Sequence, residues 1–291
     1  MRSPVIFALV ALALLGQSCS EKKPETLKVL VDSFKTNQTD SAEVKRLLQI
    51  VEGGWVDTVL AGAIERKKSV RAGYSEGLNE AEFYFDISSL SGDTLINSRG
   101  RSFYHESERF DIIFRKNLEG KPFMEIYDGR NFASVKIMLN YIFTGNDTLL
   151  SIFNSRLGAQ GVYKRVFRKP PSRNEVDITA LEYLVNKTLF EGVYKLTTGK
   201  YSQASDTVSF AADGTVKGFQ GLTWYRVETD FGHGNAPPFD MVMLSNEEGM
   251  PFPTFAFERK GNVLFLYAVK NASGEGMPSR EKLVYRLERI K

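Results

Sequence analysis

The residues best suited to catalysis in this chain are its two histidines, His105 and His233. A catalytic zinc ion typically needs three protein ligands, and His105 has acidic neighbours but no second histidine four positions further on. His233 lies in the glycine-rich segment 231–235, which lacks the strand-to-helix setting of a phosphate-binding loop. We therefore expect the chain to bind no metal ion and no cofactor.

A serine nucleophile needs a nearby base and a third group that orients that base. The two histidines fall in different halves of the chain, and the sequence identifies no such partners for them. Carboxylate pairs such as Asp111 with Glu125 could be posed as those of a glycoside hydrolase. A chain with 35 acidic residues offers many pairs of this kind, so they carry no weight. We predict that the protein is not an enzyme.

The single cysteine, Cys19, follows a segment with the layout of a secretion signal. Met1-Arg2 gives a positive start, an almost unbroken apolar run covers 5–15, and Gly16-Gln17-Ser18 precede the cysteine. The run is too short for an ordinary membrane-spanning helix. One cysteine also excludes a disulfide bond or a multi-cysteine metal site within the chain.

This arrangement resembles the lipobox of bacterial lipoproteins, in the degenerate form common in Bacteroidota. The resemblance implies cleavage between Ser18 and Cys19, acylation of Cys19, and anchoring to the cell envelope, with the outer membrane as the expected membrane. Stable anchoring takes more than one acyl chain, which a di- or triacylated cysteine provides. We predict a signal peptide over 1–18 and a lipidated tether over 19–38. The alternative is a secreted protein that loses its cysteine with the signal.

Charge and composition bound the remaining function classes. Basic and acidic residues number 38 and 35, a balance that does not favour nucleic acid, whose binders carry a clustered basic footprint. Hydrophobic residues make up 42% of the chain, enough for sizeable cores, and the 21 Phe and 12 Tyr favour strands. The expected partners are therefore the membrane and a small apolar ligand or an envelope protein.

One short pattern occurs twice and divides the chain. Gly53-x-Trp55 follows a predicted helix over about 40–52, and Gly192-x-Tyr194 follows a predicted helix that begins near Asp177. Consecutive prolines in 170–176 mark a linker, because they cannot continue a strand ladder. We therefore predict two units, 39–169 and 177–291, that arose by duplication.

Both units have the pattern of antiparallel β-structure, with short apolar segments between turn signals. In the first unit, strands are predicted near 82–87, 110–114, 123–127, 149–153 and 162–167, while 135–143 fits either a helix or a strand. In the second unit, strands are predicted near 193–198, 207–211, 215–219, 222–230, 239–244, 254–259, 263–269 and 282–290. Short turns such as Asp213-Gly214 suit an up-and-down barrel, a closure that removes edge strands.

The doubled pattern resembles the start of lipocalin-like domains. In that family Gly-x-Trp opens the first strand after a short helix, and the Trp packs across the closed end of the barrel against an Arg from the last strand. The resemblance implies a mainly β fold of two tandem lipocalin-like barrels, each preceded by a short α-helix. The residues that it implies as barrel-closing are Gly53, Trp55, Arg165 or Arg168 in the first unit, and Gly192, Tyr194, Arg286 or Arg289 in the second. The alternative is a generic all-β fold.

Two Pro-rich connections of the second unit carry apolar residues, namely Phe239 in one and Met250 and Phe252 in the other. If both flank one open mouth, these side chains line a ligand entrance or a partner patch; otherwise they fold over the barrel end as a plug. The leading hypothesis is a non-enzymatic envelope lipoprotein that binds a small apolar ligand. The alternatives are a structural or interaction subunit with filled barrels and, less favoured, a hydrolase of envelope polymers.

Overall fold

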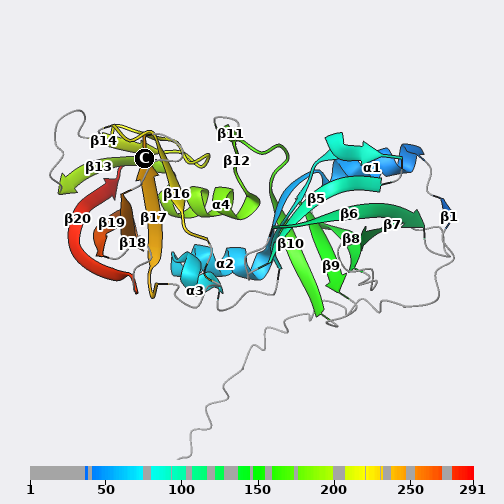
Figure 1. Ribbon diagram of the computed structural model, residues 1–291, viewed down its shortest axis with the longest axis horizontal. Helices are drawn as coiled ribbons and strands as arrows, with labels where there is room; N and C mark the ends of the chain where they lie inside the picture. Colours follow the sequence, from blue (N-terminus) through cyan, green and yellow to red (C-terminus); the bar gives the residue numbers. More distant parts are fainter. Residues whose placement is uncertain are drawn as a thin grey trace, which may run out of the picture. The chain divides into compact units, whose positions relative to one another are not determined.

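The computed structural model describes residues 37–38, 41–74, 80–92, 94–102, 107–116, 122–127, 137–144, 147–154, 159–173, 176–198, 207–219, 221–229, 231, 237–246, 253–270 and 277–291. These residues are mainly β, with two large antiparallel sheets that follow each other along the chain (Figure 1). This part of the predicted fold class is confirmed.

The first sheet has ten strands, and its pairings lead back to their starting point. From β6 the order runs through β7, β8, β9, β10, β2, β3 and β5, and β5 pairs with β6 again. The short strands β1 and β4 add to β6 and β5. The bounds are β1 Asn37–Gln38, β2 Gly53–Asp57, β3 Glu80–Phe85, β4 Leu90–Ser91, β5 Thr94–Ser102, β6 Ser107–Lys116, β7 Pro122–Tyr127, β8 Ile137–Thr144, β9 Asp147–Asn154 and β10 Ala159–Phe167.

The second sheet has eight strands in the order β15-β14-β13-β20-β19-β18-β17-β16. Its two end strands also meet, because the Val216 amide donates to the Thr223 carbonyl and the Tyr225 amide donates to the Gly214 carbonyl. All eight predicted strands are present, two of them shorter than expected. The bounds are β13 Gly192–Thr198, β14 Thr207–Phe210, β15 Val216–Lys217, β16 Trp224–Val227, β17 Asp240–Ser245, β18 Thr254–Lys260, β19 Val263–Lys270 and β20 Ser279–Arg289.

A helix precedes each sheet, as the sequence predicts. Helix α1 (Ser41–Val51) leads into β2. Helix α4 (Ala180–Val185) continues into a π-helical turn, η2 (Asn186–Phe190), which leads into β13. The segment 135–143, which fits either a helix or a strand by its pattern, lies mostly in strand β8.

Two helices interrupt the first sheet where continuous β-structure is expected from the sequence. Helix α2 (Thr58–Lys67) begins directly after β2, and helix α3 (Val70–Tyr74) follows it. The Asp57 carboxylate caps α2 by accepting a hydrogen bond from the Leu60 amide at 2.8 Å. Leu60 and Ile64 are fully buried one turn apart, so the helix is fixed by both its cap and its apolar face.

The cores do not follow the predicted division into two units. One core lies in the first sheet and joins α1 to β2, β3 and β10. The larger core contains Leu60 and Ile64 of α2 together with Leu184 of α4 and Phe257 of β18. Lys35–Lys291 accordingly form one compact unit. The predicted linker contains a small hairpin, in which β11 (Ser172–Arg173) pairs with β12 (Val176–Asp177).

Candidate functional site

The first of the two doubled motifs brings Trp55 and Arg165 together. They are cross-strand partners on β2 and β10, and the Arg165 guanidinium carbon lies 4.7 Å from the Trp55 ring centroid. The Trp55 indole nitrogen donates to the Val51 carbonyl at 2.7 Å, and Arg165 Nη2 donates to the Ile50 carbonyl at 2.6 Å. Both side chains therefore satisfy carbonyls at the C-terminal end of α1, which lack partners within the helix.

The second predicted arginine, Arg168, donates from Nη1 to the Gln49 carbonyl at 3.0 Å. Two positive charges thus lie at the negative end of the α1 dipole, a favourable arrangement. Burial lowers the pKa of Arg165, and the neighbouring Arg168 lowers it further. Gly53 has a φ of 117°, and a Cβ atom there would lie 2.1 Å from the Phe167 carbonyl oxygen. Only glycine fits this close approach of β2 to β10.

In the second motif, Tyr194 takes the place of the tryptophan. Its hydroxyl donates to the Phe190 carbonyl at 2.7 Å, and its side chain is fully buried. Arg259 of β18 donates from Nη1 to the Leu189 carbonyl and to the Tyr194 hydroxyl, both at 2.6 Å. Burial raises the pKa of Tyr194 in spite of the nearby arginine. Because Arg259 is itself buried, it replaces water as the hydrogen-bond donor at the end of η2.

Among the contacts of the described residues, neither of the two arginines predicted for the second motif donates a hydrogen bond to the Tyr194 hydroxyl or to the Leu189 carbonyl. Arg286 is half-buried and donates to the Thr197 hydroxyl at 2.9 Å. Arg289 is the cross-strand partner of Tyr194 and donates to the Lys291 carbonyl at 3.0 Å. A Cβ atom at Gly192, which has a φ of 142°, would lie 2.5 Å from Arg289 Nε. The arginine that reaches the helix end and the tyrosine hydroxyl is therefore Arg259, which sequence reasoning missed.

We call these two arrangements the Trp55 lock and the Tyr194 lock. In both, an aromatic side chain donates to the carbonyl four residues before it, and an arginine donates to the carbonyl five residues before that aromatic residue. Both also begin with a glycine at positive φ. Their common task is to satisfy the end of a helix where it turns into the first strand.

Buried carboxylates cap the N-terminal ends of helices, in some cases from the other half of the chain. The carboxylate of Glu82 on β3 accepts a hydrogen bond from the Leu181 amide at 2.6 Å, so it caps α4 from a strand 99 residues away in sequence. Asp57 caps α2 locally and is also fully buried. Burial raises the pKa of Asp57, while hydrogen bonds from the α2 amides oppose that rise.

Asp240 on β17 caps α3 across 169 residues, accepting a hydrogen bond from the Arg71 amide at 2.8 Å. Burial raises the pKa of Asp240, and hydrogen bonds from Ser69, Arg71 and Val70 oppose the rise. The Arg71 side chain also donates to the Pro237 carbonyl. Helix α3 is thereby fixed to the connection that precedes β17.

Tyr74 fixes the other end of α3. Its hydroxyl donates to the Thr229 carbonyl, and its ring meets Phe231 edge to face with centroids 5.0 Å apart. The contacts of Arg71 and Tyr74 together seat an element of the first half against both ends of the connection between β16 and β17. This contact surface could not be inferred from the sequence, which predicts no helix at 70–74.

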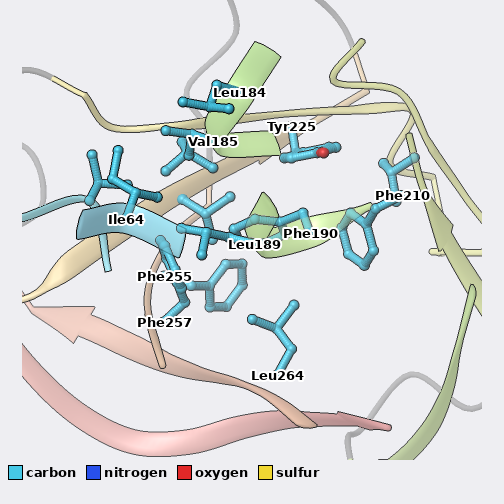
Figure 2. Packing of buried hydrophobic residues seen from close by; sticks show 14 of the residues in the cluster. Ile64, Leu184, Val185, Leu189, Phe190, Phe210, Tyr225, Phe255, Phe257 and Leu264 are labelled. Carbon is cyan, nitrogen blue, oxygen red and sulfur yellow. The ribbon is translucent and has the colours of Figure 1, made fainter. Parts of the chain in front are cut away.

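The interior of the second sheet is occupied by aromatic rings from its own chain. Figure 2 shows Phe190 pointing into the cluster from η2, and its ring lies 4.9, 5.1 and 5.6 Å from those of Phe257, Tyr225 and Phe210. A second group continues toward the other end of the sheet. Its contacts are Phe210–Phe219 at 6.2 Å, Phe219–Tyr285 at 5.0 Å and Phe255–Tyr285 at 5.7 Å.

The strand ends next to the predicted mouth residues lie at opposite ends of the second sheet. Phe239 is half-buried and directly precedes Asp240, which pairs with Phe257 toward the Gly192 end. Met250 and Phe252 lie outside the described residues. The strand ends that flank them, at Ser245 and Thr254, are at the end away from Gly192. Phe239 therefore lies on the same side as the Tyr194 lock.

Most of the remaining sequence candidates lie outside the part of the chain that the structure describes. Cys19, His105 and His233 lie outside the described residues. Glu125 faces Arg115, with Nε to Oε2 at 3.9 Å, and is the cross-strand neighbour of Ile113 and not of Asp111. Among the described residues, no group of three or more His, Cys, Asp or Glu side chains is placed to hold a metal ion.

Residues 73–77 have the Gly-x-Ser-x-Gly pattern of a serine-nucleophile elbow, which the sequence was not expected to contain. In a nucleophile elbow this pattern follows a strand and precedes a helix. Here Gly73 and Tyr74 end helix α3, and the next described element is strand β3, so the order is reversed. Ser75 and Gly77 lie outside the described residues.

In the part of the chain that the structure describes, no helix has the length and apolar character needed to cross a membrane. Comparison with protein-family models, curated proteins and solved structures gave no match.

Proposed function

We propose that the protein is a non-enzymatic lipoprotein of the bacterial envelope, anchored to the outer membrane through acylated Cys19. In this proposal both sheets close into lipocalin-like barrels with filled interiors, and the pair acts as a structural or interaction subunit. The observation that carries it is the run of aromatic rings through the interior of the second sheet.

Barrel closure is supported by the strand pairings. In the first sheet, β6 pairs with β5 on one side and β7 on the other, so eight strands form a cycle. In the second sheet, a bridge between Thr215 and Trp224 joins the ends, flanked by two backbone hydrogen bonds. A sheet that closes in this way leaves no strand edge to pair with other chains.

A filled interior favours the subunit over the binding of a small apolar ligand. Eight strands give a barrel whose centre can be filled by side chains or can hold one small ligand. Here Phe190 enters the centre from η2 and contacts Phe210, Tyr225 and Phe257. Phe219 and Tyr285 continue the packing beyond Phe210. A ligand in this region would have to displace several buried rings.

The tether fits the proposed anchor. Strand β1 pairs with β6 at Lys116 and Arg115, so the described part of the chain starts at Asn37. Cys19 and Asn37 are eighteen positions apart in sequence, a stretch that spans at most roughly 60 Å when fully extended. An acylated Cys19 would therefore keep the sheets within that distance of the membrane.

A cavity-forming substitution tests whether the interior is filled. We expect Phe190→Ala to open an apolar cavity and to lower the free energy of unfolding by about 3–5 kcal/mol. Toluene should bind in this cavity and raise the melting temperature of the variant. Wild type and Phe265→Ala, whose ring is on the outer side of β19, should show no rise with toluene. A wild type that binds toluene or a fatty acid with similar stabilisation would favour the ligand-binding alternative.

Mass spectrometry of the membrane-extracted protein tests the anchor. Wild type should begin at Cys19 and carry the mass of its acyl chains, whereas Cys19→Ala should lack the added mass and leave the membrane fraction. An unmodified, soluble wild type would contradict the lipoprotein proposal. It would not affect the conclusion that aromatic side chains fill the interior of the second sheet.

A further inference from the structure

The ends of β19 and β20 form a ribbon that extends past the packed part of the second sheet. We call Tyr267–Lys270 with Ser279–Leu283 the rim ribbon. Its strands pair at Val269 with Arg280 and at Lys270 with Ser279. All residues of Ser279–Leu283 are exposed, whereas Tyr285 and Leu287 further along β20 are buried. Strand β13 pairs with β20 from Arg286 to Arg289, beyond the ribbon.

Exposed apolar side chains gather at this ribbon. Leu283 is 38% exposed, and Met277, two residues before the second strand of the ribbon, is 63% exposed. The other large apolar side chains exposed among the described residues, Val59 and Ile290, lie on α2 and at the end of the chain. Isolated exposed apolar residues are common. Met277 differs from them because it lies beside the outer end of the ribbon, where Lys270 pairs with Ser279, whereas Leu283 lies at the inner end opposite Tyr267.

The ribbon also carries a net positive charge. Lys270, Arg280 and Lys282 are exposed, and Glu281 is the one acidic residue in 267–270 and 277–283. The Arg280 guanidinium carbon lies 4.5 Å from the Tyr267 ring centroid, and Arg280 Nη1 is 3.9 Å from Glu258 Oε2. Arg280 is therefore held in place on the ribbon. Isolated two-stranded ribbons are only marginally stable in water, so these contacts and the pairing of Tyr267 and Ala268 with β18 help to keep the ribbon formed.

We propose that the rim ribbon docks on the surface of an anionic lipid bilayer, with Met277 at the level of the lipid headgroups. Apolar side chains flanked by Lys and Arg are the chemistry of interfacial membrane binding, and a tyrosine suits the same depth because it is apolar with one polar end. The Lys and Arg side chains of the ribbon favour negatively charged headgroups such as phosphatidylglycerol. This docking does not depend on Cys19.

The chain offers a site-specific test, because replacing Cys19 leaves it without any other cysteine. Full-length Cys19→Ala proteins that also carry Met277→Cys, Val59→Cys or Ile290→Cys would be labelled with an environment-sensitive NBD fluorophore. They would then be mixed with vesicles of equal parts phosphatidylcholine and phosphatidylglycerol. The labels at 59 and 290 are matched controls, since the side chains there are 46% and 52% exposed.

The label at 277 should shift to the blue and brighten several-fold, and the labels at 59 and 290 should not. Adding Arg280→Gln and Lys282→Gln should raise the lipid concentration needed for half the change by about tenfold. All variants share the same N-terminus and lack Cys19, so failure of the anchor proposal leaves this result unaffected. The inference is overturned by no change at 277, by equal changes at all three sites, or by an equal change with a soluble polyanion alone.

Discussion

The Trp55 lock and the Tyr194 lock perform the same task with different side chains from different strands. Trp55 lies beside Arg165 of β10, the last strand of its half, whereas Tyr194 receives a hydrogen bond from Arg259 of β18. In both halves the helix ends on carbonyls that receive hydrogen bonds from the aromatic residue and from the arginine. The two locks share the hydrogen bonds to the last carbonyls of the helix. They differ in the strand that supplies the arginine.

The locks also differ in how closely their glycines are enclosed. Gly53 faces the backbone of β10, and Gly192 faces the flexible side chain of Arg289 together with the last carbonyl of the chain. A backbone atom within a sheet cannot move aside without breaking strand pairing, but an exposed side chain can. Substitution of Gly53 should therefore be more damaging than substitution of Gly192.

The largest effect is expected for Gly53→Ala. The new Cβ would lie 2.1 Å from the Phe167 carbonyl oxygen at a φ of 117°, so the loss in unfolding free energy should be about 3 kcal/mol or more. Gly192→Ala should lose about 1–2 kcal/mol, because Arg289 can move. Urea unfolding followed by circular dichroism measures both. Equal losses would mean that backbone enclosure does not distinguish the locks.

Removal of Arg259 should be the next most damaging change. Arg259→Ala leaves the buried Tyr194 hydroxyl and the Leu189 carbonyl without this donor, and we expect a loss of about 2–4 kcal/mol. The matched control is Arg286→Ala, a half-buried arginine whose loss should cost no more than about 0.5 kcal/mol. If Arg286→Ala proved the more destabilising, the role assigned to β18 would be wrong.

Removal of Arg165 should have a smaller effect than removal of Arg259. Arg165 is only partly buried, and Arg168 stays at the same helix end, so Arg165→Ala should cost about 1–2 kcal/mol. Arg165→Lys should recover part of the loss, because an ammonium group can still face the Trp55 ring. The same urea unfolding series gives the values. A neutral Arg165→Ala would show that the indole alone satisfies the end of α1.

The strands and the doubled start of each half could be predicted from the sequence, because they depend on local signals. Alternating apolar residues and Asp-Gly turns mark strands such as β14 and β15, and Gly192-x-Tyr194 marks the start of β13. Helices α2 and α3 were not predicted, although Asp57-Thr58 and the spacing of Leu60 and Ile64 are local signals for a capped helix.

Long-range pairing was beyond the reach of sequence reasoning. Arg259 is 65 residues from Tyr194, and nothing local distinguishes it from Arg286 or Arg289. The caps supplied by Glu82 and Asp240 join positions 99 and 169 residues apart. Such contacts depend on strand register and on where α2 and α3 pack, so they become visible only once the chain is folded.

The smallest effect concerns the two caps, Asp57 within its own half and Asp240 between the halves. Burial raises the pKa of Asp240 above the usual value of 3.8, so the folded protein binds this proton more tightly than the unfolded chain does. The associated stabilisation is complete below the unfolded pKa and is lost as pH rises through the folded pKa. Relative to Asp240→Asn, wild type should therefore gain unfolding free energy as pH falls from 7 to below 4.

Asp240→Ala separates this charge effect from the cap itself. It removes the acceptor for the Val70 and Arg71 amides, so it should be less stable than Asp240→Asn at every pH by about 1 kcal/mol. Asp57→Asn is the matched comparison, because burial raises the pKa of Asp57 as well but its cap stays within α2. Both Asn variants should flatten the pH profile. Of the two Ala variants, which remove the acceptor, only Asp240→Ala should also raise the rate at which the α3 amides exchange with deuterium, because Asp57 caps α2. Equal exchange in the two Ala variants would mean that Asp240 does not fix α3 to the second sheet.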